Sequence, residues 1–78
     1  METKGYAVIE IQTQDNGQLS ILKDGFTDEG KAWQKYYTVL SFAAVSTLPC
    51  HAATIMDNKG FVMDNRYFEN GVEMPEEA

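Results

Sequence analysis

The chain has 78 residues with one cysteine and one histidine, which excludes an internal disulfide and a four-ligand zinc site. Its formal net charge is −6, from 12 acidic and 6 basic residues. The cations are dispersed, which argues against a nucleic acid partner, because such binding depends on clustered Lys and Arg.

The organisation expected of so short a chain is one domain. Residues 1–69 are predicted to form it, and residues 70–78 an acidic, flexible tail. A domain of this size buries only about 60% of its unfolded surface, and oligomerisation is the expected remedy. No apolar run reaches the roughly 18 residues of a membrane span, and residues 1–4 do not resemble a signal peptide. A soluble, cytoplasmic protein without a membrane partner or cofactor is expected.

A β-hairpin is predicted first. Residues 6–12 alternate in polarity, residues 15–17 (Asp-Asn-Gly) signal a turn, and residues 19–23 begin the return strand. A two-residue loop would pair Glu10 with Lys23, whereas a three-residue loop with a left-handed Gly17 would pair Ile11 with Ile21. The second register is preferred because it gathers four aliphatic side chains on one face. They are Ile9, Ile11, Leu19 and Ile21.

A helix is predicted from Asp28 to about Ser46, with Thr27 as its N-cap and an end imposed by Pro49. Apolar residues at three- and four-residue spacing predict one buried stripe. Its members are Trp33, Tyr36 or Tyr37, Leu40, Ala43, Ala44 and Thr47.

A second hairpin is predicted from residues 50–56 and 61–68, joined by the turn at residues 57–60. If Gly60 closes a three-residue loop, the expected pairs are Ile55–Met63, Ala53–Asn65 and His51–Tyr67. Asp57 and Asp64 then lie on opposite faces, and Arg66 shares a face with Ala52 and Thr54. The order ββαββ predicts an α+β fold, a four-stranded, mostly antiparallel sheet with the helix on one face.

Large apolar residues occur at both parities of the predicted strands, yet one helix covers only one face of a sheet. The second face is therefore expected either to pack against another copy, giving a dimer or higher oligomer, or to bind a ligand.

No catalytic centre is predicted. Cys50 and His51 are neighbours on a strand and point to opposite faces, so they cannot act as a nucleophile and base. Cys50 is expected to be a buried thiol, and His51 to satisfy a backbone carbonyl or contact a ligand. Glu10 is expected to be solvated or paired with a lysine. No carboxylate pair, phosphate loop or metal-ligand cluster is recognisable, so we expect a protein without enzymatic activity.

The aromatic residues of the helix offer a binding surface. Trp33, Tyr36 and Tyr37 span more than one helix face, so at least one lies at a boundary, where it can stack on a base or line an interface. Arg66 is expected either to pair with Asp64 or to bind a phosphate or carboxylate.

Three short elements give the chain a family resemblance. They are Glu10-Ile11-Gln12, Ala43-Ala44-Val45-Ser46 and Pro49-Cys50-His51. With them, the chain resembles a family of short, mostly uncharacterised proteins encoded by phages and prophages of Gram-positive bacteria. The similarity covers nearly all of the chain except its acidic tail. Members often carry a small or acidic residue near Trp33 and a histidine near Tyr37, and this chain departs from the family at both positions.

The resemblance implies a phage accessory protein in the bacterial cytoplasm. One such type is an oligomeric sponge that sequesters a nucleotide-derived immune signal, a cyclic dinucleotide or an ADP-ribose derivative. Lys35 could also meet phosphates. Alternatives are a protein that inhibits a host enzyme through an acidic, DNA-like surface and a small structural or regulatory phage protein. The expected ligand-binding residues are Trp33, Tyr36, Tyr37, His51, Arg66 and Tyr67.

Overall fold

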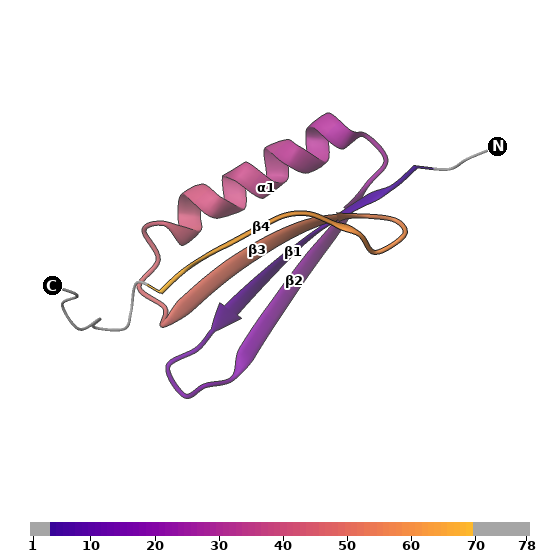
Figure 1. Cartoon of the computed structure of the whole chain (residues 1–78). Coiled ribbons are helices and arrows are strands. Elements are labelled where there is room, and N and C mark those ends of the chain that lie inside the picture. The colour runs from indigo at the N-terminus through magenta and orange to yellow at the C-terminus, as the bar shows by residue number, and fades with distance from the viewer. Residues whose placement is uncertain (1–3, 70–78) are drawn as a thin grey trace, which may run out of the picture.

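The fold is a four-stranded antiparallel sheet with one helix on one face (Figure 1), in a computed structural model that describes residues 4–69. The strands follow the spatial order β2-β1-β3-β4, and α1 lies mainly over β3 and β1. This confirms the predicted ββαββ order and α+β class. The predicted tail lies outside the described residues. The elements are β1 (Tyr6–Thr13), β2 (Leu19–Phe26), α1 (Glu29–Ala43), β3 (Cys50–Asp57) and β4 (Val62–Phe68).

The first hairpin has the preferred register. Gln14 N donates to Gln18 O at 2.8 Å, and the loop between them closes through Gly17, whose φ is 89°. This left-handed conformation favours glycine because it has no Cβ. The loop sets Ile11 opposite Ile21. The four aliphatic residues therefore share one face, as predicted, and it is the face that α1 does not cover.

The helix is shorter than predicted at both ends. Its N-cap is Asp28, whose Oδ1 accepts from Lys31 N at 3.1 Å, so the prediction of Thr27 was wrong by one residue. Both residue types cap well, and only the chain path decides between them. At the other end, Val45 N and Ser46 N donate to carbonyls three residues back, a tighter turn that ends the regular helix at Ala43.

The buried stripe of α1 consists of Ala32, Tyr36, Val39 and Ala43. Tyr36 is fully buried and Tyr37 is 57% exposed, which settles the alternative between them. Trp33 and Leu40 pack against the core from its edge. Ala44 and Thr47 are exposed, contrary to prediction, because the helix ends before them.

A β-bulge changes the second hairpin. Gly60 closes the predicted loop with φ 90°, and Met56 pairs with Val62, but an extra residue in β4 then places Asp64 opposite Ile55. The predicted pairs beyond the loop are therefore wrong by one residue. His51 pairs with Phe68 and Ala53 with Arg66. The bulge moves Asp64 and Arg66 to the face that α1 covers.

The two faces of the sheet can be read from the registers. Under α1, the central strands contribute Val8, Ala53 and Ile55 to the core. The face without a helix is called here the open face, and its strand residues form four rows across β2, β1, β3 and β4. The rows are Gly25–Ala7–Met56–Val62, Lys23–Ile9–Thr54–Asn65, Ile21–Ile11–Ala52–Tyr67 and Leu19–Thr13–Cys50.

Candidate functional site

The predicted ligand-binding residues occupy three separate places. Trp33, Tyr36, Tyr37 and Arg66 lie on the helix side, toward the β4 edge. His51 is buried on the face that α1 covers, and its Nε2 is hydrogen-bonded to Glu10 of β1. Tyr67 lies on the open face, with 62% of its surface exposed. One subunit therefore does not bring all six together.

The first place is called here the β4 flank and is made of Trp33, Tyr36, Tyr37, Asp64 and Arg66. Trp33 and Tyr37 are stacked, with ring centroids 5.7 Å apart and planes 27° apart. Trp33 meets Tyr36 edge to face at 5.6 Å. Trp33 Nε1 also donates to Glu29 Oε2 at 3.1 Å, which fixes the indole at the helix surface. The exposed side of the stack is the Tyr37 ring.

Helix geometry places these rings on the β4 side. Lys35 pairs with Asp24 of β2 at 3.4 Å, and each residue turns the helix by about 100°. Tyr37 therefore lies on the flank away from β2. The Tyr36 hydroxyl is close enough to Asp64 and Arg66 of β4 for their charges to act on it.

The Tyr36 hydroxyl is the polar end of a fully buried ring and has no hydrogen-bond partner among residues 4–69. Asp64 lies near enough for its carboxylate to act on the hydroxyl, but outside ordinary hydrogen-bonding geometry. Burial, reinforced by the negative charge of Asp64, raises the pKa of Tyr36 to about 12. Arg66 counteracts this only partly. The expected Arg66–Asp64 pair does not form a salt bridge within residues 4–69, and Arg66 is an exposed residue.

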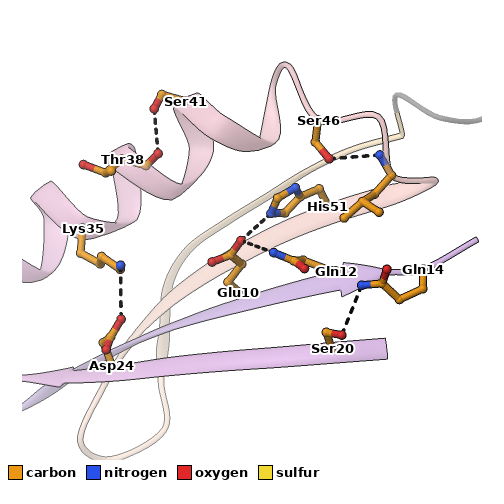
Figure 2. A network of polar contacts seen from close by, with 11 residues as sticks. Glu10, Gln12, Gln14, Ser20, Asp24, Lys35, Thr38, Ser41, Ser46 and His51 are labelled. Atoms are coloured by element: carbon orange, nitrogen blue, oxygen red, sulfur yellow. Dashed lines mark hydrogen bonds and ion pairs between the residues drawn. The ribbon is translucent and has the colours of Figure 1, made fainter. Parts of the chain in front are cut away.

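The second place is a polar cluster of Glu10, Gln12 and His51, shown in Figure 2. His51 Nε2 lies 2.6 Å from Glu10 Oε2, and Gln12 Nε2 donates to the same oxygen at 2.9 Å. Glu10 and Gln12 come from β1, and His51 comes from the adjacent β3, where it pairs with Gln12 in the register. The cluster thus joins the segments Glu10-Ile11-Gln12 and Pro49-Cys50-His51.

Electrostatics keep Glu10 ionised. Burial alone raises its pKa, but the hydrogen bonds from Gln12 and His51 and the positive charges of His51 and Lys35 outweigh burial and hold the pKa below 4.5. Because an ionised carboxylate only accepts, His51 Nε2 carries the proton in this contact. His51 is 5% exposed, and its Nδ1 atom has no partner among the described residues.

These facts correct two expectations. Glu10 pairs with His51 instead of a lysine, and His51 satisfies a side chain instead of a backbone carbonyl. Cys50 does lie on the opposite face from His51, as predicted, but it is half-buried where a buried thiol was expected. Asp57 and Asp64 share the helix side, contrary to prediction, because of the bulge. Asp57 closes the turn by accepting from Lys59 N at 2.9 Å and Phe61 N at 3.0 Å.

The sequence prediction missed Glu10 and Gln12 as partners of His51. They lie 41 and 39 residues away in the chain, so their meeting depends on the β1–β3 register. The one available signal was that Glu10 and Gln12 share the parity of Val8, which belongs to the core face.

A shallow hollow opens near the start of α1. Its lining comes from the first residues of β1, the β3–β4 turn and the helix N-terminus: Lys4, Gly5, Tyr6, Glu29, Asp57, Asn58, Lys59 and Met63. None of the predicted ligand residues lines it. Within residues 4–69, no group of three or more His, Cys, Asp or Glu side chains is placed to hold a metal ion.

Comparison with protein-family models, curated proteins and solved structures finds no match for this chain. In the described part of the chain, no helix has the length and apolar character needed to cross a membrane.

Proposed function

We propose that the protein is a non-enzymatic, phage-type accessory protein that binds and sequesters a nucleotide-derived signal at the β4 flank. The observation that carries this proposal is an aromatic cluster beside β4, in which Tyr37 stacks on Trp33 and both rings contact Tyr36. Arg66 of β4 is exposed, and its charge reaches the Tyr36 hydroxyl. A base stacks on the outer side of Tyr37, and Arg66 meets a phosphate.

The binding residues in this proposal are Trp33, Tyr37 and Arg66. Tyr36 is fully buried and contacts both rings from the core side. His51 is already engaged by Glu10, and it is therefore not assigned a ligand contact. Tyr67 projects from the opposite face and takes no part in this site.

The test is a thermal-shift titration with cyclic di-AMP, cyclic di-GMP and ADP-ribose. A true ligand at a hundredfold excess over its Kd stabilises the protein by about 2.7 kcal/mol. Tyr37→Ala and Arg66→Gln should abolish the shift. Phe42→Ala is the matched control, because Phe42 is another exposed aromatic of α1, and this variant should keep the shift. No shift with any of the three compounds would contradict the proposal.

A second candidate is inhibition of a host enzyme, and the net charge of −6 favours it. An acidic surface attracts the basic groove of a nucleic-acid enzyme and resembles DNA in charge. This candidate predicts a host protein that is captured by the immobilised chain, is released by added DNA and binds less tightly as salt increases. Capture that DNA and salt leave unchanged would argue against it.

A further inference from the structure

The two faces of the sheet have an inverted distribution of charge. The covered face carries charges on every strand, namely Glu10, Asp24, Asp57, Asp64 and Arg66. Among the strand residues of the open face, Lys23 alone is charged. An antiparallel sheet with one solvated face normally places its polar residues on that face. The open face therefore has the composition of a buried surface.

Large apolar side chains on the open face project outward. Ile21 is 60% exposed, and Leu19, Val62 and Tyr67 are exposed to a similar extent. Ile11 and Ala52 lie between Ile21 and Tyr67, so one row crosses all four strands without a polar residue. Contiguous apolar patches of this kind are rare on monomeric soluble proteins.

The polar residues of this face lie mainly in one row. Lys23 is on the edge strand β2 and Asn65 is on the edge strand β4, while Ile9 and Thr54 lie between them. Asn65 also accepts a hydrogen bond from the Thr54 hydroxyl at 3.2 Å. An apolar centre with polar groups at the edges is the usual anatomy of a protein interface.

We infer that the open face packs against the open face of a second copy of this chain. The net charge of −6 makes two copies repel, and this repulsion is weakest where the face has no acidic strand residue. Two identical sheets have the same twist, which suits aligned face-to-face packing at about −30°. The result is a four-layer dimer with the two helices outside and a β-sandwich inside.

The size of the face fits this occupant. Four strands about 4.8 Å apart, each of seven or eight residues at about 3.3 Å, cover on the order of 500 Å² in projection. Two copies together then bury on the order of 1,000 Å², which reaches the lower limit for a specific interface. The apolar core under α1 is small and includes three alanines, Ala32, Ala43 and Ala53, so burial of a second apolar layer adds substantially to it.

Light scattering after size exclusion, from about 1 to 100 µM of the full chain, tests the inference. The expected mass is twice 8.8 kDa at the upper end. A mass of 8.8 kDa across the whole range would overturn the inference, and the face would then belong to another partner.

Two neighbouring substitutions identify the face. Ile21 lies on the open face, and Leu22 lies on the covered side with 49% exposure. Ile21→Lys should yield a monomer, whereas Leu22→Lys should leave the dimer intact, because its new charge lies beside Glu10. A dimer that survives Ile21→Lys, or a monomer in both variants, would contradict this face as the interface.

An experiment on the unmodified chain remains decisive if Ile21→Lys does not fold. A mixed sample of isotope-labelled and unlabelled copies should give intermolecular NOEs from the methyl groups of Ile9, Ile11 and Ile21. Intermolecular NOEs confined to the helix, or none in a sample of dimer mass, would overturn the inference. Because the β4 flank lies on the other side of the sheet, loss of ligand binding would not affect either result.

Discussion

The covered and open faces of the same sheet differ in how many polar side chains they carry and in how these are hydrogen-bonded. Under α1, polar groups are tolerated because they are paired, as Glu10 is with Gln12 and His51. The open face carries few polar side chains and therefore forms few side-chain hydrogen bonds. A charged residue can therefore lie on the inner face of a small domain when its partner comes from the adjacent strand.

The covered face also carries two unsatisfied atoms, the Tyr36 hydroxyl and His51 Nδ1. Both belong to side chains that are almost completely buried. Such atoms cost free energy unless another group reaches them. Substitutions at these two residues should therefore show whether the free energy of unfolding rises or falls when an unsatisfied polar atom is removed.

The largest expected effect comes from removing the central ring of the covered face. Tyr36→Ala should lower the free energy of unfolding by about 3–5 kcal/mol, because it leaves a large cavity under α1. Tyr36→Phe should be neutral or stabilising, because it removes an unsatisfied hydroxyl. Tyr37→Ala, at the exposed neighbour, is the comparison and should cost only about 0.5–1.5 kcal/mol, because it loses the stacking on Trp33. Urea denaturation measures all three, and a strongly destabilised Tyr36→Phe would show that the hydroxyl has a partner.

The next largest loss of stability is expected from substitutions in the polar cluster of Glu10, Gln12 and His51. His51→Leu leaves the Glu10 carboxylate without a main partner and should cost about 1–3 kcal/mol. The double variant Glu10→Leu with His51→Leu replaces the pair by apolar groups and should be less destabilised than the sum of the two single variants. Strict additivity in this double-mutant cycle would mean that the 2.6 Å contact does not couple the two residues.

Acid should weaken the covered face through Glu10. Its pKa is lower in the folded protein than its usual 4.5, so the unfolded chain binds this proton first. The stability gained from the ionised group is therefore present above pH 4.5 and is lost as pH falls through the lower folded pKa. Glu10→Gln should make the stability less dependent on pH in this window. Asp57, whose pKa is also lowered by hydrogen bonds from the turn, contributes equally to both proteins and cancels in the difference.

The smallest expected effect is at the rim of the covered face. Lys35 and Asp24 form an ion pair of 3.4 Å with both side chains about half exposed. Exposed pairs of this kind contribute about 0.2–1 kcal/mol. Lys35→Met should therefore change the urea midpoint slightly, and 1 M NaCl should remove most of the difference. A larger loss that salt does not reduce would show that Lys35 stabilises the fold by more than this exposed ion pair.

Local signals in the sequence were sufficient to predict the order of the helix and strands, both turns and the register of the first hairpin. The glycines at positions 17 and 60 carry the left-handed conformations that close the two loops. The bulge in β4 has no such signal, since Val62, Met63 and Asp64 fit a regular strand equally well, and it displaced every pair beyond it. Because side chains alternate between the two faces along a strand, a shift of one residue places Arg66 on the face opposite to the predicted one.

The candidate site was less accessible to sequence reasoning. The rings of Trp33, Tyr36 and Tyr37 contact one another. Which tyrosine is buried depends on a rotation of about 100° about the helix axis. The Glu10–His51 contact depends on strands that are distant in the chain, and no local pattern specifies the order β2-β1-β3-β4. Long-range pairing is what the sequence alone left undetermined.

If the open face pairs as proposed, both faces of the sheet are buried, one by α1 and the other by a second copy. The most direct test of this claim is the urea midpoint of the wild-type chain at 1 and 100 µM. If folding and pairing are coupled, a hundredfold higher concentration stabilises the dimer by about 2.7 kcal/mol, and the midpoint rises accordingly. The same midpoint at both concentrations would contradict the claim.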